Sequence, residues 1–300
     1  TIRVQSIPLK KQIYLTHHAL VCTGNDKLYL FGGIDENGNP QNLFREINLT
    51  QRKVKHANSQ NIPARYDPLM VNRGQYFYVF GGTPDGINQF NDLWQFLLTD
   101  TRFEATQLAT QSAIHPAPSD GYTMTFFDDD TIILIGGSSE FHIYHYSIRQ
   151  DQWNQREPQG VHLESLRGHQ SVQIDSEHIL IFGGKIKSNV YNNGVLIYEP
   201  KTGNMSILRT TGIYPFNRIN HHAIPLNKHL VIVFGGETEK MPTNEESNKY
   251  VECFSSINNE QTLIYLLNLI TGEWSFLNTL SQDIDFLSIP HGAVAYCLPA

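Results

Sequence analysis

Histidines recur at matched places along this chain of 300 residues. Two adjacent pairs, His17-His18 and His221-His222, each precede a short β-prone segment, and His169 stands in a similar place between them. Imidazole nitrogens that converge in space can bind a transition metal. No cysteine or carboxylate accompanies these histidines at the spacing of a metal site. We therefore expect them to be held by backbone carbonyls, and we expect no metal and no other cofactor.

Other signatures of catalysis are missing from the sequence. There is no Gly-x-Ser-x-Gly motif that would mark a nucleophilic serine. The doubled glycines of the chain are not followed by a helix with Lys-Ser or Lys-Thr, which a phosphate-binding loop requires. These observations favour a protein that is not an enzyme.

The charge balance argues against nucleic acid as a partner. Lys and Arg total 22 against 29 Asp and Glu, which gives a formal net charge of −7, and no basic run occurs. A protein that binds nucleic acid normally carries a basic stripe. No apolar run reaches the roughly 18 residues of a membrane-spanning helix, so we also expect no such segment in this chain.

Cysteine usage bears on the compartment. The three cysteines, Cys22, Cys253 and Cys297, show no CxxC pairing, which favours a reducing compartment such as the cytoplasm. Glycosylation acceptor patterns at Asn48 and Asn204 leave an extracellular location open. Because the chain starts at a threonine rather than a methionine, we expect it to be a fragment or a processed form.

A doubled glycine closes a short apolar run at five places and sets the period of the chain. The pairs are Gly32-Gly33, Gly81-Gly82, Gly136-Gly137, Gly183-Gly184 and Gly235-Gly236, spaced by 49, 55, 47 and 52 residues. A regular period of this length indicates one structural unit repeated. Glycine suits a strand end that turns sharply, because it adopts φ values that side chains disfavour.

Each unit can be divided into four short strands. A β-prone segment, a polar turn and the apolar run before the glycines form a hairpin. A third apolar segment follows at 43–47, 93–96, 143–146, 195–198 and 264–267. The fourth strand then carries a bulky residue, which is Val54, Phe103, Trp153, Met205 or Trp274. Four antiparallel strands per unit, repeated radially, are typical of propeller blades.

This pattern resembles the kelch repeat. The shared features are a lead-in similar to Arg-x-Gly-His, an apolar strand ending in Gly-Gly, a Tyr in the third strand and a Trp in the fourth. The fourth unit shows the lead-in as Arg167-Gly168-His169, whereas the second has Asp67-Pro68 instead of Gly-His. The resemblance covers residues 12 to about 276. It implies an all-β fold, namely a kelch-type β-propeller of four-stranded antiparallel blades.

The repeats predict a single propeller domain over residues 1–300. Five recognisable repeats lie near residues 12–60, 61–113, 114–163, 164–212 and 213–285, and a partial sixth spans 286–300. Residues 1–8 could supply an outermost strand that closes the ring. We therefore expect six blades in all, with the sixth cut at residue 300 or continuing past it.

The resemblance also implies where a partner binds. In kelch proteins that bind peptides, arginines of the lead-in line the ligand face, so Arg65, Arg167 and Arg218 could grip the carboxylates of an acidic peptide. The alternative is that each arginine holds its own turn between blades. Tyr and Arg often dominate protein interfaces. The expected partner-binding residues are Arg65, Tyr66, Tyr122, Arg167, His169, Arg218 and His221.

The predicted function is a non-catalytic module that binds a partner protein or peptide through loop and channel-mouth residues at one face. The long insertion at residues 237–261 is a further place where binding could occur. The alternative is an enzyme on a kelch-like propeller, either carbohydrate-processing or similar to copper oxidases. Because Cys22 and Cys297 fall inside expected strands, they argue against the Tyr-Cys crosslink of a copper oxidase site.

Overall fold

The computed structural model describes residues 13–23, 26–58, 62–99, 103–238 and 264–277, which contain five four-stranded antiparallel sheets, here called blades 1 to 5. Blade 1 comprises β1 (Ala19–Cys22), β2 (Lys27–Phe31), β3 (Leu43–Asn48) and β4 (Lys53–Asn58). Blade 2 comprises β5 (Leu69–Arg73), β6 (Tyr76–Phe80), β7 (Leu93–Leu98) and β8 (Phe103–Leu108). Blade 3 comprises β9 (Tyr122–Phe126), β10 (Thr131–Gly136), β11 (His142–Ser147) and β12 (Gln152–Arg156). Blade 4 comprises β14 (Arg167–Gln173), β15 (Ile179–Lys185), β16 (Val195–Glu199) and β17 (Asn204–Leu208). Blade 5 comprises β20 (His222–Asn227), β21 (Leu230–Phe234), β23 (Ile264–Asn268) and β24 (Glu273–Leu277).

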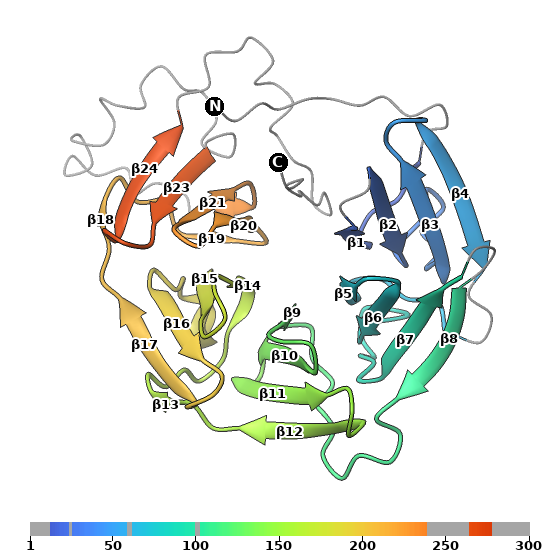
Figure 1. Ribbon diagram of the computed structural model, residues 1–300, viewed down its shortest axis with the longest axis horizontal. Helices are drawn as coiled ribbons and strands as arrows, with labels where there is room; N and C mark the ends of the chain where they lie inside the picture. The colour runs from blue at the N-terminus through green and yellow to red at the C-terminus, as the bar shows by residue number, and fades with distance from the viewer. Residues whose placement is uncertain (1–12, 24–25, 59–61, 100–102, 239–263, 278–300) are drawn as a thin grey trace.

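The blades stand side by side around a common axis (Figure 1). The first strand of each blade lies nearest the axis, and the fourth strand lies at the rim. This arrangement confirms the prediction of an all-β propeller of four-stranded antiparallel blades. The partial sixth repeat at 286–300 and the closing strand expected at 1–8 lie outside the described residues. Closure by six blades and the repeat boundaries therefore stay predictions.

The second strand of each blade is apolar on both faces because each face packs against a different neighbour. In β6, Phe77 and Val79 belong to the cluster shared with blade 1, whereas Tyr78 and Phe80 belong to the cluster shared with blade 3. Side chains alternate across a strand, so one strand can supply two interfaces. The strands β10 and β15 alternate in the same way, so each pair of neighbouring blades shares its own buried cluster.

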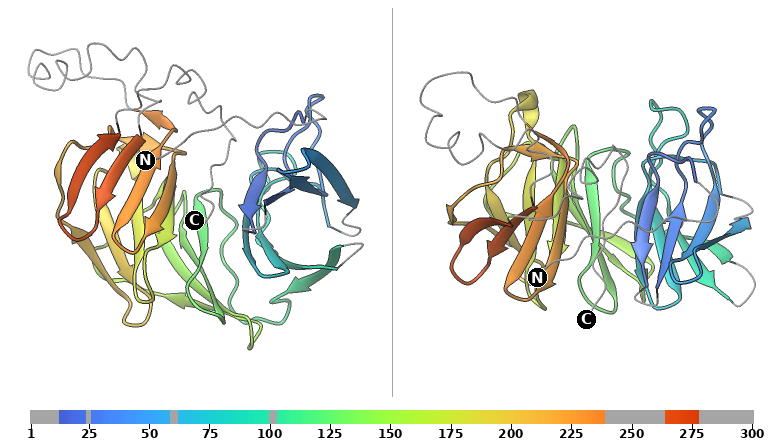
Figure 2. Two further views of the ribbon diagram at one scale, coloured as in Figure 1. Left: turned by 45° about the horizontal axis from the view of Figure 1, so that its top comes forward. Right: turned by 90° about the horizontal axis from the view of Figure 1, so that it is seen from above.

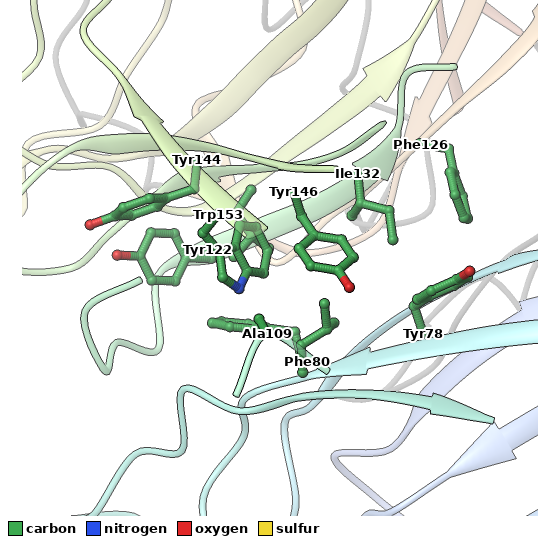
Figure 3. Packing of buried hydrophobic residues seen from close by; sticks show 11 residues of the cluster. Tyr78, Phe80, Ala109, Tyr122, Phe126, Ile132, Tyr144, Tyr146 and Trp153 are labelled. Atoms are coloured by element: carbon green, nitrogen blue, oxygen red, sulfur yellow. The ribbon is translucent and has the colours of Figure 1, made fainter. Parts of the chain in front are cut away.

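The bulky residue predicted in the fourth strand packs between blades. Trp153 in β12 is 2% exposed, and its ring centroid lies 5.7 Å from that of Phe80 and 5.0 Å from that of Tyr146 (Figure 3). Aromatic pairs at such distances contribute about 0.5–1.5 kcal/mol beyond the burial of their area. The equivalent residues of blades 2, 4 and 5 are also buried, whereas that of blade 1 is only half-buried; these are Phe103, Met205, Trp274 and Val54.

The first glycine of three pairs, Gly32, Gly136 and Gly183, makes room for the following blade. Gly136 and Gly183 have φ of +119° and +70°, the positive values that the sequence predicted. A Cβ on Gly183 would lie 2.5 Å from Cε1 of His221, and a Cβ on Gly136 would lie 2.5 Å from Cε1 of His169. The histidine ring of one blade thus occupies the space that a side chain on the previous blade would need.

The linkers between blades protect two outer edges. The strand β13 (Gln159–Gly160) pairs in parallel with β17, and β18 (Thr211–Gly212) pairs in parallel with β24. The linker into blade 3 is fastened by side chains instead, since the N–H of Trp153 donates to Oγ of Ser112 at 3.0 Å. These contacts satisfy backbone groups that an outer strand would otherwise leave unpaired.

The connections between second and third strands lie on one face of the propeller, here called the loop face. The lead-in segments reach the same face, and β19 (Arg218–Ile219) pairs there with β22 (Glu237–Thr238). The loop of blade 3 is short, at residues 138–141, whereas those of blades 2 and 4 extend over 83–92 and 186–194. The right view of Figure 2 shows both longer loops rising beyond blade 3. The blade 4 loop contains the short helix η1 (Lys187–Asn189), and residues 239–261 of the predicted insertion lie outside the described residues.

Candidate functional site at the channel mouth

A cavity of about 440 Å³ opens where the lead-in segments of all five blades meet on the loop face. We call it the mouth cavity. Its wall contains side chains of both charges as well as imidazole and amide groups. Polar residues of this wall include His17, Asp67, Asp120, Arg167, Lys185 and Asn220.

Four residues of this wall have left-handed backbone conformations. They are His17, Asp67, Gly168 and Asn220, with φ of +55°, +52°, +67° and +53°. Glycine, asparagine, aspartate and histidine tolerate this region better than other residues. The N–H of Asp67 donates to the carbonyl of His17, and the N–H of Asn220 donates to the carbonyl of Gly168, each at 2.8 Å. Neighbouring blades are therefore tied together by their backbones at the mouth.

The resemblance placed Arg65 and Arg218 on a ligand face, but the structure buries both side chains. Each side chain is 0% exposed. The two terminal nitrogens of Arg65 meet the carboxylate oxygens of Asp92 at 2.6 and 2.9 Å, and Nη1 also donates to the carbonyl of Gly81. Nη1 of Arg218 donates to the carbonyl of Gly235 at 2.9 Å. Both guanidinium groups are drawn inward because they satisfy the carbonyl of the first glycine in their own blade.

Arg167 does not share the position of these two arginines. The carbonyl of Arg65 accepts the N–H of Gly33 at 2.9 Å, and the residue of blade 4 that does the same for Gly137 is Leu166, at 3.0 Å. Arg167 is therefore one residue further along. Since neighbouring residues of a strand point to opposite sides, this offset exposes Arg167 and leaves Leu166 buried. Arg65, Arg167 and Arg218 therefore do not lie together on one accessible surface.

His169 and His221 contribute to the cavity wall, yet their rings are buried, at 2% and 0% exposure. They hold the same position as His18 in blade 1, because each of the three histidines directly precedes the residue that pairs with the last apolar residue of the second strand. Burial lowers the pKa of His169 to about 3 and that of His18 to about 4, and the pKa of His221 falls well below its ordinary value. All three rings are consequently neutral at neutral pH.

The two predicted tyrosines differ in access. Tyr122 is 5% exposed and packs between Phe80 and Tyr144, with ring centroids 6.2 Å away on either side, and burial raises the pKa of its hydroxyl. Tyr66 is half-buried, and its ring meets that of His17 edge-on at 6.0 Å. Of the seven predicted residues, Arg167 and Tyr66 thus present the accessible surface that a partner could touch.

The polar groups of the mouth cavity are divided by sign. Arg167 and Lys185 belong to blade 4, whereas Asp67 and Asp120 belong to the lead-ins of blades 2 and 3. Nδ1 of His17 lies 2.8 Å from Oδ1 of Asp67. The sequence patterns did not mark these two aspartates or Lys185 as candidates. The position of Lys185, directly after a glycine pair, was the signal that could have drawn attention to it.

The described residues offer little for a metal or a membrane. Among them, no group of three or more His, Cys, Asp or Glu side chains is placed to hold a metal ion. The same part of the chain contains no helix with the length and apolar character needed to cross a bilayer.

Five radially arranged four-stranded blades, with a glycine pair ending each second strand, define a kelch-type β-propeller. The model of one family, the Attractin/LZTR1 beta-propeller, matches residues 28–297, and the chain belongs to that family.

Curated relatives share the propeller at low identity. The chain is 22% identical over 282 residues to putative protein tag-53 of Caenorhabditis elegans, which covers 87% of this chain and 20% of that protein. It is 28% identical over 143 residues to beta-scruin of Limulus polyphemus, which covers 43% of this chain and 15% of that protein. It is 26% identical over 253 residues to N-(sulfonatooxy)prop-2-enimidothioate sulfolyase of Thlaspi arvense, which covers 75% of this chain and 71% of that protein. The chain thus spans a small part of the first two relatives, and their whole-protein activities do not transfer to it.

Proposed function

We propose that this propeller is a non-catalytic module that binds a partner protein across the loop face, over the mouth cavity. Kelch-like propellers are typical protein-interaction modules. The observation that carries the proposal is the separation of roles at the mouth. Arg65, Arg218 and His221 are buried and hold the scaffold, whereas the polar groups of the cavity stay accessible above them.

The loops beside the cavity supply apolar contacts for such a partner. Ile87 at the tip of the blade 2 loop is 84% exposed, and Val190 in the blade 4 loop is 55% exposed. The shorter loop of blade 3 lies between the loops of blades 2 and 4 (Figure 2). A partner segment that crosses blade 3 could therefore touch both tips and still reach the cavity. Loops carried on a rigid scaffold are where binding residues concentrate, which is why these two positions are chosen for the test.

The experiment compares matched apolar residues on the two faces. The double variant Ile87→Asp with Val190→Asp alters the loop face, and Ile270→Asp alters the β23–β24 turn on the opposite face, where Ile270 is 71% exposed. Partners that cross-link to the wild-type domain in cells are identified and quantified by mass spectrometry. We expect the loop-face variant to lose the specific partners and the Ile270 variant to keep them. Retention by the first and loss by the second would place binding on the other face.

The sulfolyase bears on the enzyme alternative, because the match covers 71% of that protein. The lyase activity in its name belongs to that protein and is only a candidate activity for this chain. A carbohydrate-processing or copper-oxidase activity would require a reactive group or metal at the mouth cavity. Metal analysis of the purified protein separates these options, since stoichiometric copper would favour the oxidase reading over a binding module.

A further inference from the structure

Two asparagines lie in the acceptor pattern for N-linked glycans, and the proposed function uses neither of them. The patterns are Asn48-Leu49-Thr50 and Asn204-Met205-Ser206. A glycan is bulky and hydrated, so a folded protein can carry one only where the asparagine side chain opens to solvent. The two patterns are equivalent in sequence, whereas the structure gives their side chains different surroundings.

The side-chain nitrogen of Asn48 is accessible. Asn48 is the last residue of β3, and the turn that follows it is exposed at Thr50, Gln51 and Arg52. Its Oδ1 accepts the N–H of Gln51 at 2.7 Å. Among the described residues, Nδ2 of Asn48 has no hydrogen-bond partner and yet is not buried, so it opens to solvent. The oxygen of this amide therefore holds the turn, while the nitrogen, where a glycan attaches, is left free.

The side chain of Asn204 is enclosed by contacts. Its Nδ2 donates to Oε1 of Glu199 at 3.0 Å, and its backbone N–H donates to Oγ1 of Thr202 at 3.1 Å. The backbone of Asn204 lies between β16 and the linker strand β13. On the β13 side the approach is close, since a Cβ on Gly160 would lie 3.5 Å from Oδ1 of Asn204. A glycan on Nδ2 would need the space that Glu199 and the linker strand occupy.

We propose that Asn48 carries an N-linked glycan in this protein and that Asn204 does not. The donor is an oligosaccharide linked to a lipid pyrophosphate, which the secretory pathway of the cell supplies. Nδ2 of Asn48 forms a bond to the anomeric carbon of the sugar and gives up one proton. The bond from that carbon to the pyrophosphate breaks, and the pyrophosphate leaves with the electron pair. Because Oδ1 takes no part, the hydrogen bond from Gln51 survives in the product.

The position of Asn48 decides what such a glycan would cover. The strand β3 begins on the loop face, so its last residue and the β3–β4 turn lie on the opposite face. A glycan there shields the turns of blade 1 and leaves the loop face and the mouth cavity open. It also places this part of the chain in the secretory pathway, rather than in the reducing compartment that the cysteine usage favoured. The glycan site does not depend on the proposed function, since partner binding at the loop face can fail without affecting it.

The first test maps glycans on the protein purified from the cells that make it. Peptide N-glycosidase converts a glycosylated asparagine to aspartate, and in water enriched in heavy oxygen it labels that residue for peptide mass spectrometry. We expect the label at Asn48 and none at Asn204. A sample incubated without the enzyme measures spontaneous deamidation. An unlabelled Asn48, or a labelled Asn204, would overturn the proposal.

The second test uses matched substitutions in the same cells. Thr50→Ser keeps the acceptor pattern and the hydroxyl that donates to Oδ2 of Asp26 at 2.7 Å, whereas Thr50→Val removes both. Ser206→Ala removes the other pattern. We expect the Thr50→Val protein alone to lose the gel shift of one glycan. Loss of that shift in Ser206→Ala, or its retention in Thr50→Val, would contradict the assignment. If Thr50→Val fails to fold, the mapping of the wild-type protein still decides.

Discussion

Arg65 and Arg218, three blades apart, make the same two hydrogen bonds to backbone carbonyls of their own lead-in and blade. Nε donates to the carbonyl two residues upstream, which belongs to Pro63 or Phe216, at 3.2 and 3.1 Å. Nη1 donates to the carbonyl of the first glycine of the blade's pair, at 2.9 Å in both cases. The guanidinium thus ties the lead-in of a blade to the end of its second strand.

Replacing Arg65 with alanine should destabilise the propeller strongly. The substitution leaves the carboxylate of Asp92 without its bidentate partner and the carbonyl of Gly81 without a donor. Removing one partner of a buried charged pair typically costs about 3–5 kcal/mol. Urea denaturation followed by circular dichroism measures the loss. A change below about 1 kcal/mol would show that the tie contributes little.

Arg167→Ala is the matched comparison for Arg65→Ala. Its side chain is exposed, so it should shift the free energy of unfolding by no more than about 0.5 kcal/mol. Relief of the repulsion with Lys185 could make that shift a small stabilisation. An Arg167→Ala protein as unstable as Arg65→Ala would assign Arg167 a structural role after all.

Gly183→Ala should be more harmful than its backbone conformation alone explains. The added Cβ would lie 2.5 Å from Cε1 of His221 and 2.8 Å from the carbonyl oxygen of Arg218. Gly74→Ala is the control, because Gly74 also has positive φ, at +57°, but a Cβ there meets nothing within 4 Å. We expect a loss of about 1 kcal/mol at Gly74 and about 3 kcal/mol at Gly183. Equal losses of unfolding free energy in the two variants would mean that the His221 ring can move aside at little cost.

Stability should fall as the pH drops below about 6.5. The pKa values of His18 and His145 are lowered to about 4 and that of His169 to about 3, chiefly by burial. Between the unfolded and folded pKa values, the unfolded chain binds protons that the folded protein does not. Each such histidine then removes about 1.4 kcal/mol of stability per pH unit. Above the unfolded pKa the contribution is fully present and constant.

His169→Gln isolates one of these protons. The free energy of unfolding of this variant should depend less steeply on pH between about 6 and 4 than that of the wild type, whatever its stability at neutral pH. His115→Gln serves as the comparison, because it removes an exposed imidazole rather than a buried one. An unchanged slope for His169→Gln would indicate that its ring is protonated in the folded protein.

Trp153→Ala should open a cavity between blades 2 and 3. Its indole contacts rings from both blades, including Phe80 and Tyr144 (Figure 3). Deletion of a buried tryptophan side chain typically costs about 3–5 kcal/mol. Trp94 is half-buried and holds Asp92 through a 2.6 Å hydrogen bond, so Trp94→Ala should cost less. Urea midpoints in the reverse order would contradict the placement of Trp153 in the shared core.

Much of the fold could be predicted because its signals are local. Each glycine pair lies at the end of a second strand or one residue before it, and the third strands begin within one residue of the predicted positions. The parallel strands β13 and β18 were not predicted. They are two residues long and pair only through their backbones, so no side-chain pattern marks them.

The candidate site was harder to predict, because the alignment of each lead-in segment with its neighbouring strands decides which side chains are exposed. Arg65 and Arg167 both stand 16 residues before a glycine pair, and this equal spacing predicted equivalent positions for their side chains. In the structure a one-residue offset puts Leu166 in the place of Arg65. A shift of one residue turns a strand side chain from the interior to the surface. Sequence spacing cannot resolve such an offset when the linkers differ in length.

The alternation seen in β6 also holds at the two ends of the described row of blades. Leu28 and Leu30 of β2, and Ile232 and Phe234 of β21, belong to clusters that draw described residues from a single blade. If the row of blades stayed open, its first and last blades would each expose an apolar face to water. Closure of the ring buries both faces and stabilises the fold. We expect one more sheet between these two apolar faces, so that every blade has a neighbour on both sides.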